Sequence, residues 1–496
     1  MMKPVRTRIA PSPTGHMHIG TARVALYDYL LARKTGGQFV LRIEDTDVSR
    51  TVPGAEQEII DGLRWLGLNY DEGPDIGGPY GPYRQTERRE IYRRHAQILI
   101  DRGHAFPCFC SAERLESVRQ EQFRRKENPH YDGTCRDLAT AESAKRISEG
   151  EAHVIRFRMP REGITLAVDQ LRGEIATENA QLNDFVLLKS DGLPTYHLAA
   201  IVDDHEMEIT HVLRGSEWLG TFPLHVNIVR AFGWEEPLWI HLSVFLKPSG
   251  KGKMSKREAA AAIKDGHSIF IKDMQDLGFI PEGVLNWGAL MGWGVPEDDV
   301  MTLAQMVDRF DLRGLTPSPA AVNFQKLDHF NATHIRMLTN ADLAARIKPY
   351  FVKQGLSVDE EVLPRIVPLL RERLVTLDDC IPFGAFFFKD QVLPLVEDLV
   401  PKGLDRSQTM RILKESHGIL SELGSFDNSA AEASLRGYVD QHGLAVNQVF
   451  GALRVAITGQ KVSPPLFETM EILGRKVCLD RIQQAINLLE AAKSMD

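Results

Sequence analysis

Two short segments with residue types suited to phosphate chemistry lie far apart in the chain. The first, His18–Thr21, reads His-Ile-Gly-Thr and stands where a loop enters a predicted helix. A helix N-terminus offers unpaired N–H groups and the positive end of the helix dipole, which together attract a phosphate. Gly20 allows a close approach to the backbone, and the His18 imidazole can donate a hydrogen bond to a phosphate oxygen. Alone this segment is weak evidence, because His-x-Gly also occurs by chance.

The second segment, Lys253–Arg257, reads Lys-Met-Ser-Lys-Arg and follows the glycine-bearing stretch 248–252. Three cations within five residues could neutralise the charge that builds up on a pyrophosphate leaving group. An arbitrary basic pentapeptide is more often a solvated surface loop. The functional interpretation therefore depends on the two segments occurring together.

A cysteine cluster is the third candidate for chemistry. Cys108 and Cys110 are followed by Cys135 after 24 intervening residues, with His104 and His130 nearby. Two close thiolates and a third across a loop suit tetrahedral zinc. The chain has five cysteines, an odd and unevenly spaced set that does not suggest a disulfide framework. The remaining two are Cys380 and Cys478.

The elements that must position the first segment form a strand–helix–strand unit. Residues 5–10 read as a strand, 11–15 as a turn-rich loop and 20–34 as a helix with an apolar face, which Gly36-Gly37 ends. Residues 39–43 read as the next strand. Such a βαβ unit implies a right-handed crossover and a parallel sheet.

The middle of the chain has a mixed pattern. Residues 85–190 hold the cysteine cluster, a charged helical stretch at 112–126 and short strands. An apolar strand set is then predicted at 196–203 and 209–214, followed by a helix at 221–232. This order predicts that the parallel sheet resumes after an insertion.

Helical patterns dominate from about residue 330 onward. No internal repeat or low-complexity segment is evident. The last third is therefore predicted to be all-α, with helices at 341–354, 360–377, 407–418 and 480–492.

Length, charge and apolar content limit the possible classes of protein. A chain of 496 residues suggests roughly three to four domains. The formal net charge of −8 argues against a nonspecific nucleic-acid binder, although contacts to RNA phosphates need only a local basic face. No apolar run reaches the roughly 18 residues that span a bilayer, and the start lacks an apolar signal core. No membrane association and a cytoplasmic location are expected.

Together the two phosphate segments resemble the paired signatures of class I aminoacyl-tRNA synthetases, whose usual forms are His-Ile-Gly-His and Lys-Met-Ser-Lys-Ser. Thr21 and Arg257 depart from these forms in the way that is usual in the glutamate branch. The chain resembles the bacterial glutamyl-tRNA synthetases over its whole length. The longest matches are Arg8–Gly15, Leu41–Asp47, Asp203–His205, Arg214–Trp218 and Leu453–Gly459.

The resemblance implies a multidomain fold. An α/β Rossmann-like parallel-sheet catalytic domain with an inserted α+β domain would be followed by all-α anticodon-binding domains. The expected divisions are 1–84 (catalytic domain, first half), 85–193 (acceptor-stem-binding insertion with a possible zinc site), 194–245 (catalytic domain, second half), 246–330 (stem-contact region carrying the Lys-Met-Ser-Lys-Arg loop), 331–400 (helical anticodon-binding domain) and 401–496 (second helical anticodon-binding domain).

The implied activity has two steps. Glutamate would attack the α-phosphorus of ATP to give glutamyl-adenylate and release pyrophosphate. A terminal ribose hydroxyl of tRNA(Glu) would then take the glutamyl group from the adenylate and release AMP. The resemblance further implies that activation needs bound tRNA. Mg²⁺ is expected with ATP, and a monomer is expected, although the sequence alone does not give the oligomeric state. The residues assigned to catalysis are His18, Lys253 and Lys256, and those assigned to ATP are Thr14, His18, Gly20, Lys253, Ser255, Lys256 and Arg257.

A pocket for glutamate must bind two carboxylates and an ammonium, which requires at least one arginine and one anion. Arg8 and Ser12 resemble the pair that holds the side-chain carboxylate, and Glu44 resembles the partner of the α-ammonium. Tyr196 and Arg214 resemble further pocket residues. Taken singly, these residues would be explained as well by surface salt bridges or core packing. Together they would converge at the carboxyl edge of one parallel sheet.

Two assignments remain open in the sequence. The fourth zinc ligand is either Asp137, where the family often carries histidine, or Tyr131, which matches a related pattern. Arg373 aligns by resemblance with an arginine that inspects the third anticodon base, but an exposed helical charge explains it equally well.

Several other functions compete with a glutamate enzyme specific for tRNA(Glu). A nondiscriminating enzyme would also charge tRNA(Gln), and an inactive synthetase-like protein would only bind RNA. A truncated paralogue that glutamylates queuosine lacks the anticodon module, so the long helical C-terminal region argues against it. A small-molecule nucleotidyltransferase would likewise not need those helices.

Overall fold

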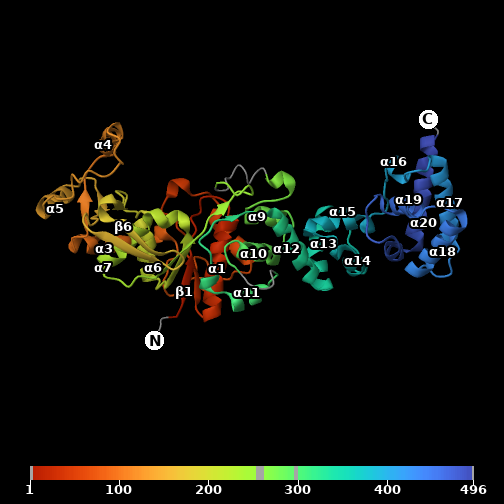
Figure 1. Ribbon diagram of the computed structural model, residues 1–496, viewed down its shortest axis with the longest axis horizontal. Helices are drawn as coiled ribbons and strands as arrows, with labels where there is room; N and C mark the ends of the chain where they lie inside the picture. The colour runs from red at the N-terminus through yellow and green to blue at the C-terminus, as the bar shows by residue number, and fades with distance from the viewer. Residues whose placement is uncertain (1–3, 253–261, 295–299, 494–496) are drawn as a thin grey trace. The chain divides into compact units, whose positions relative to one another are not determined.

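The computed structural model describes residues 4–252, 262–294 and 300–493, and Figure 1 shows its helices and strands. The strands of this described part all precede residue 325, and helices make up the regular structure after it. Two compact units result, Met1–Asp276 with Val284–Phe324 and Leu277–Gly283 with Gln325–Asp496. The predicted change from α/β to all-α structure is confirmed.

The first unit begins with the predicted strand–helix–strand motif. Strands β1 (Arg6–Ile9) and β2 (Gln38–Leu41) pair in parallel, and α1 (Ile19–Thr35) connects them. Helix α1 ends at Gly36, whose φ of 65° lies in the left-handed region that favours glycine. A Cβ on Gly37 would lie 2.1 Å from the carbonyl oxygen of Val5, so only glycine fits beside β1.

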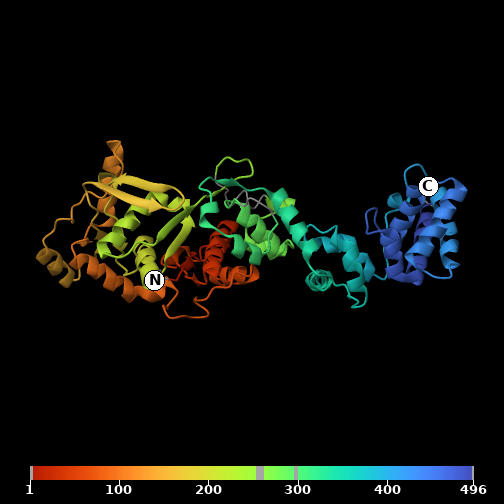
Figure 2. The same cartoon turned by 60° about the horizontal axis from the view of Figure 1, so that its bottom comes forward.

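The strands of the second half of this unit form a four-stranded sheet of their own, which a hydrogen bond links to β1. The backbone N–H of Thr210 donates to the carbonyl of Arg6 over 3.0 Å and so joins β8 (His211–Gly215) to β1. Strand β9 (Leu238–Leu242) pairs in parallel with β8 and with the end of β5 (Ile164–Asp169). The β5–β6 hairpin, whose second strand is Gly173–Glu178, is drawn in yellow in Figure 2. The predicted parallel sheet is therefore confirmed, with β6 as its antiparallel edge.

One element of this region was predicted wrongly. Residues 196–203 read as an apolar strand, but Tyr196–Glu206 form helix α6. The side chains from Leu198 to Asp204 are all buried, so this helix has no exposed polar face in that stretch. A short run buried on every side has the same apolar pattern as a central strand. The next two predictions hold, since β8 and α7 (Phe222–Phe232) lie where a strand and a helix were expected.

A second sheet carries the cysteine cluster. It is antiparallel and consists of β3 (Ala105–Cys108), β4 (Val154–Phe157) and β7 (Val186–Leu188). Helix α3 (Arg89–Asp101) contacts β3 and β7. The helices near the cysteines are α4 (Ala112–Arg124) and α5 (Thr140–Ser148).

Shorter elements complete the first unit. Leu246 and Ala321 lie in a two-residue parallel pairing of strands. The chain bounds are α2 Ala55–Trp65, β10 Phe245–Leu246, α9 Ile271–Asp276, α10 Pro281–Leu290 (which begins in the second unit), α11 Leu303–Arg309 and β11 Ala320–Ala321.

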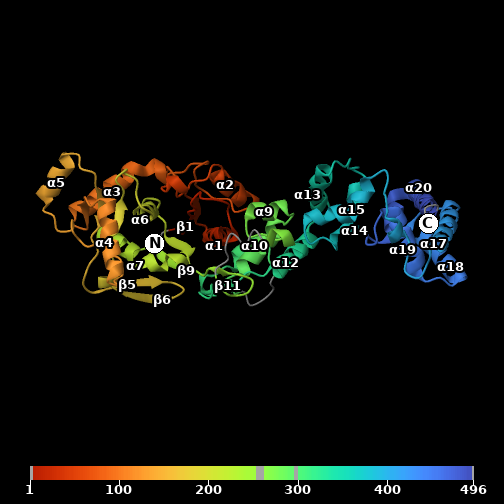
Figure 3. The same ribbon diagram turned by 90° about the horizontal axis from the view of Figure 1, so that it is seen from above.

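The second unit contains the helices that the sequence predicted, with shifted ends. The predicted 360–377 helix stops earlier, at Arg371, and the predicted 480–492 helix is the later part of a longer one, which breaks at Gly474. Figure 3 shows the last four helices grouped together. The bounds are α12 Phe324–Met337, α13 Asn340–Lys353, α14 Val362–Arg371, α15 Cys380–Gly384, α16 Val396–Leu399, α17 Arg406–Ser421, α18 Asn428–His442, α19 Val446–Thr458 and α20 Leu466–Lys493.

A short segment from earlier in the chain belongs to this second unit. Leu277–Gly283 packs with the later helices, and Ile280 is buried in their apolar core at 1% exposure. The backbone N–H of Ile280 donates to Asn331 Oδ1 over 2.8 Å, and Leu377 N–H donates to the Gly278 carbonyl over 2.8 Å. The helical unit is therefore discontinuous in sequence.

Within the described ranges, no helix is both long enough and apolar enough to cross a membrane.

Candidate active site

The first phosphate segment lies at the start of α1, as predicted. His18 is the N-cap residue, and its Nδ1 accepts a hydrogen bond from the Thr21 N–H over 3.2 Å. A Cβ on Gly20 would lie 2.8 Å from two atoms of the His18 ring. Gly20 therefore makes room for the imidazole itself, a reason that the sequence did not suggest. Thr14 lies in the preceding turn, where its N–H donates to the Ser12 carbonyl.

The second phosphate segment, residues 253–257, lies outside the described residues. Both stretches that flank it contact the start of α1. The Ile19 N–H donates to the Ile269 carbonyl over 2.7 Å, and the Met17 carbonyl accepts from Ile271 over 2.9 Å. On the other side, the guanidinium of Arg23 lies 4.1 Å from the centre of the Phe245 ring. Residues on both sides of the second segment in sequence therefore lie close to the first segment.

Behind the sheet edge, three arginines and three carboxylates form a buried arginine–carboxylate cluster. Arg42 is its centre, since it lies 2.7 Å from Asp204 and 3.0 Å from Glu44 and is fully buried. Formal charges cancel within the set. The members are Arg8, Arg42, Arg88, Glu44, Asp203 and Asp204.

The two predicted glutamate contacts in this cluster are already paired. Arg8 donates to Asp204 Oδ1 through Nε over 3.0 Å and to the Leu213 carbonyl through Nη1 over 3.1 Å. Burial opposes the charge of Arg8, but Asp204 outweighs it and raises the pKa of the guanidinium. Burial raises the pKa of Glu44, against the influence of Arg42. The side chains of Arg8 and Glu44 are thus already held by oppositely charged neighbours within the cluster.

Arg214, on β8, has a different environment. Its Nε donates to His241 Nε2 over 2.9 Å, and its Nη1 lies 2.8 Å from His225 Nδ1. No carboxylate pairs with Arg214 within the described ranges, and its buried Nη2 makes no hydrogen bond there. Burial lowers the pKa of Arg214, and the neighbouring Tyr196 counteracts this. Arg214 is therefore a buried cation with an unused donor.

Tyr196 lies near these charges although its strand assignment was wrong. It is the first residue of α6, and its ring stacks on Trp218 with the centres 4.0 Å apart. Burial raises the pKa of Tyr196 to about 12, and the charges of Arg214, Glu44 and Arg8 also act on it. These four predicted pocket residues come together. Ser12 is exposed in the loop after β1, and no side-chain hydrogen bond joins it to them in the described part of the chain.

Several residues of this site were missed in the sequence. Asp203 and Asp204 were noted as part of a family match, but their buried pairing with arginines was not predicted, although two acidic residues in an otherwise apolar stretch are a signal for it. His225 and His241 gave no local signal at all. Both contact Arg214, which lies on β8 and is 11 residues from His225 and 27 residues from His241 in sequence.

The cysteine cluster is compact. The Sγ atoms of Cys108, Cys110 and Cys135 lie within 4.8 Å of one another. The Tyr131 hydroxyl lies 3.4 Å from Cys108 Sγ and 3.7 Å from Cys110 Sγ. Asp137 is instead paired with Arg158 over 3.2 Å, and its side chain is 86% exposed. Within the described residues, the Tyr131 hydroxyl is the oxygen that lies beside the three thiols as a fourth donor.

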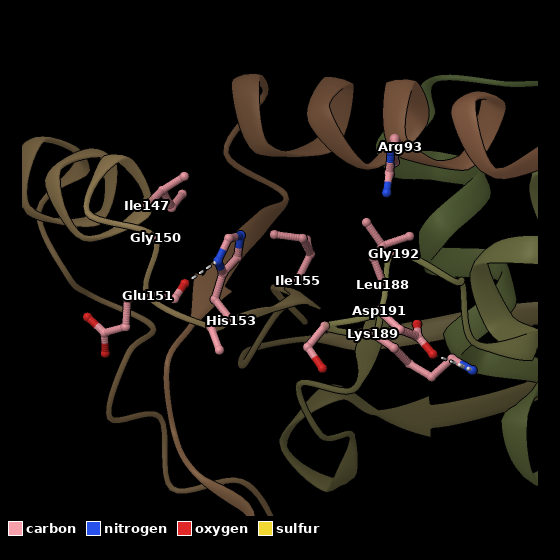
Figure 4. Close-up of a pocket in the computed structure, with 12 residues that line it drawn as sticks. Arg93, Ile147, Gly150, Glu151, His153, Ile155, Leu188, Lys189, Asp191 and Gly192 are labelled. Atoms are coloured by element: carbon pink, nitrogen blue, oxygen red, sulfur yellow. Dashed lines mark hydrogen bonds and ion pairs between the residues drawn. The ribbon is translucent and has the colours of Figure 1, made fainter.

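A cavity of about 420 Å³ lies elsewhere in the first unit, where α3, the end of α5 with the loop after it, β4, and the end of β7 with the turn after it meet (Figure 4). None of the residues predicted to be functional lines it. Two of its lining groups are already engaged, since Lys189 lies 3.9 Å from Asp191 and the His153 Nδ1 lies 3.0 Å from the Glu151 carbonyl. The cavity is therefore separate from the site around Arg214.

The predicted anticodon residue lies just beyond α14. Arg373 is exposed, its backbone N–H donates to the Leu370 carbonyl over 2.8 Å, and its guanidinium lies 5.8 Å from the centre of the Phe383 ring. The structure thus leaves this side chain accessible on the helical unit.

Comparison with known proteins identifies the class that this fold and site define. Residues 4–329 match the family of class I tRNA synthetases (E and Q), catalytic domain, and residues 342–486 match an anticodon binding domain. The protein is a class I aminoacyl-tRNA synthetase.

Relatives of known identity narrow this class. A glutamate–tRNA ligase of Dehalococcoides mccartyi is 41% identical over 500 residues, which cover 100% of both chains. One from Herpetosiphon aurantiacus is 42% identical and covers 99% of this chain and 98% of its own. The chain belongs to the glutamate–tRNA ligase family.

A solved structure agrees with this assignment. The crystal structure of a glutamate tRNA ligase from Elizabethkingia meningosepticum, in complex with its amino acid, matches with a TM-score of 0.88 at 35% identity. The match covers 98% of this chain and 100% of the other. The family, the fold class and the enzyme class predicted from the sequence are thereby confirmed.

Proposed function

We propose that this chain activates glutamate with ATP and transfers the glutamyl group to the 3′-terminal ribose of tRNA(Glu). The observation that carries the choice of amino acid is Arg214, a buried cation with an unused Nη2 and no paired carboxylate in the described part of the chain. Glutamate would supply the missing anion through its side chain. Glu44, whose charge also acts on Tyr196, is the proposed partner of the α-ammonium.

We infer that Arg8 contributes less to binding the side-chain carboxylate than the sequence suggested. An arginine has five N–H donors, and Asp204 and Leu213 take three of those on Arg8. Two donors would remain for a ligand oxygen, but Asp204 already neutralises the charge. We therefore assign the side-chain carboxylate mainly to Arg214, with Arg8, Ser12 and Tyr196 as further contacts.

Positioning and charge stabilisation would supply the catalysis, because the attacking carboxylate needs no protein nucleophile. His18 and Gly20 would hold the ATP phosphates at the start of α1, with Thr14 in the adjoining turn. Lys253, Ser255, Lys256 and Arg257 remain assigned to the leaving pyrophosphate from the sequence. The flanks of that segment contact the start of α1, which supports this assignment. Mg²⁺ bound with ATP would neutralise further phosphate charge.

The test of the amino acid assignment is Arg214→Gln, a neutral variant that keeps hydrogen-bonding capacity. We expect a large rise in the KM for glutamate in aminoacylation and little change in the KM for ATP. An unchanged glutamate KM would refute the assignment. Exchange of pyrophosphate into ATP, measured with and without tRNA, tests whether activation requires tRNA and also excludes an inactive RNA-binding protein.

The cysteine cluster fits a structural zinc ion. A tetrahedron with bonds of about 2.3 Å has edges of about 3.8 Å, and the Cys110–Cys135 sulfur separation is 3.6 Å. The Tyr131 oxygen lies at similar distances from two of these sulfurs. We propose Cys108, Cys110, Cys135 and Tyr131 as the ligands, in preference to Asp137. Metal analysis of the purified protein and of Cys110→Ser tests this.

The choice of tRNA is proposed to lie in the helical unit. Arg373 is accessible there, as the reading of an anticodon base requires. We assign residues 85–193 to the acceptor stem and 331–496 to the anticodon, in a cytoplasmic monomer. Aminoacylation of total tRNA followed by identification of the charged isoacceptors decides between a tRNA(Glu)-specific enzyme and one that also charges tRNA(Gln).

A further inference from the structure

A continuous chain of hydrogen bonds runs through Arg214 across the buried part of the first unit. Asp169 Oδ2 lies 2.7 Å from His241 Nδ1, and His241 Nε2 accepts from Arg214 Nε over 2.9 Å. On the other side, Arg214 Nη1 lies 2.8 Å from His225 Nδ1, and His225 Nε2 lies 3.0 Å from His197 Nδ1. Two histidines thus hold two of the three guanidinium nitrogens.

This geometry fixes the protons on both histidines that contact Arg214. The carboxylate of Asp169 can only accept, so His241 carries its proton on Nδ1 and offers Nε2 as an acceptor. Arg214 always donates, so His225 accepts through Nδ1 and carries its proton on Nε2, from which it donates to His197. Each imidazole is neutral in this arrangement, since a second proton would face an arginine N–H.

The buried setting keeps these imidazoles neutral. Burial lowers the pKa of His225, and the positive charge of Arg214 lowers it further. Burial also lowers the pKa of His241, although the hydrogen bond to Asp169 acts in the opposite direction. His197 is held neutral as well, because burial and then Arg214 lower its pKa to about 4.

The contrast with Arg8 shows what neutral partners achieve. Arg8 is held by Asp204, a carboxylate that cancels its charge. Arg214 is held by two hydrogen bonds to neutral imidazoles, which leave its charge uncompensated, and the carboxylate of Asp169 is one imidazole removed. A buried cation whose charge is not cancelled binds an anionic side chain far more strongly than a neutral amide of the same shape.

We propose that His225 and His241 are positioning and specificity residues, which orient Arg214 through neutral acceptors and so preserve its positive charge for the side-chain carboxylate of the substrate. This rests on the proposed function, because it assumes that Arg214 binds that carboxylate. The histidines themselves would not touch the substrate. Their contribution would be the preference for an acidic amino acid over its amide.

The test compares two variants of nearly equal shape. His225→Asn keeps a neutral acceptor near the position of Nδ1, whereas His225→Asp places a carboxylate there. We expect the aspartate variant to raise the KM for glutamate by about ten- to a hundredfold relative to the asparagine variant, the range for a lost charge-assisted hydrogen bond. The preference for glutamate over glutamine should fall by a similar factor, while kcat at saturating glutamate changes less than KM.

His95→Leu is the matched control for removal of a buried histidine, since His95 bonds to the Ile91 carbonyl on α3 and lies 3.2 Å from Glu206, and in the described part of the chain no hydrogen bond joins it to Arg214. It should leave the glutamate KM near the parent value. Equal glutamate constants for His225→Asn and His225→Asp overturn the proposal. Should the aspartate variant not fold, His225→Leu replaces it: loss of the acceptor must raise the glutamate KM above that of the asparagine variant, and equality again overturns the proposal.

The parallel Arg214→Gln variant separates the two levels of the argument. If it leaves glutamate use unchanged, the proposed function is wrong. If it impairs glutamate use while the His225 pair does not differ, the glutamate assignment stands and only the role of the histidines is wrong.

Discussion

Replacing Arg8 with alanine removes one cation from the buried arginine–carboxylate cluster. Arg8 is only 4% exposed, and its Nε lies 3.0 Å from Asp204. The cluster is neutral as a set, so the variant would leave an excess negative charge away from water. The effect of this variant is therefore not confined to substrate binding.

The size of the loss follows from what remains around Asp204. Removing one partner of a buried ion pair costs about 3–5 kcal/mol. Asp204 keeps Arg42 at 2.7 Å, so part of its charge stays compensated. We expect the free energy of unfolding of the first unit to fall by about 3 kcal/mol, the lower end of that range.

Tryptophan fluorescence during urea unfolding measures this loss selectively. The chain has six tryptophans, and all of them belong to the first unit. The signal therefore reports that unit even if the two units unfold separately, which a whole-chain probe could not resolve. The residues are Trp65, Trp218, Trp234, Trp239, Trp287 and Trp293.

A double variant provides the control. Arg8→Ala with Asp204→Leu removes both charges, so it should be less destabilised than the sum of the single variants, with a coupling of about 1–3 kcal/mol. Strict additivity, or an unfolding free energy for Arg8→Ala within about 0.5 kcal/mol of the parent, would refute the buried ionic cluster as the source of stability.

Three further outcomes follow from the structure. Gly20→Ala should displace the His18 ring, which lies 2.8 Å from the added Cβ, and so lower kcat while the melting temperature changes little. An unchanged kcat would contradict this close approach. Tyr131→Phe removes a proposed ligand, so it should weaken zinc retention against a chelator by at least the about 10–100-fold that loss of an outer-shell partner costs. Asp137→Asn should not weaken it, and the reverse order would assign the ligand to Asp137. Burial raises the pKa of Asp204 but its two arginine partners lower it below the usual value. Stability from this group is then present at neutral pH and lost as pH falls below about 4, so Asp204→Asn should flatten that acid limb in urea unfolding, and a parallel limb would argue against the shift.

Local patterns were sufficient for the elements whose signals are local. The Gly36-Gly37 stop and the strand–helix–strand order depend on neighbours in sequence, and both were predicted. The stretch 196–203 was not, because a helix buried on all sides lacks the polar face that reveals a 3.6-residue period. Its flanking strand and helix were found.

The candidate site was predictable only in part for a related reason. Resemblance supplied Arg8, Glu44, Tyr196 and Arg214, and the fold brings these four together. It did not supply their partners. Asp204 is 196 residues from Arg8, so no sequence window contains the pair that fixes the charge of the pocket.

The small segment 277–283 has a consequence for how such proteins can be rearranged. A fragment that begins at residue 325 would lack Ile280 in its apolar core and the carbonyl of Gly278 that accepts from Leu377. The helical unit is therefore not a cassette that can be exchanged at a single junction. Recombination between relatives would preserve it only if the donor of the helices also supplied the seven-residue segment. During synthesis, these residues also leave the ribosome before the helices that they help to complete.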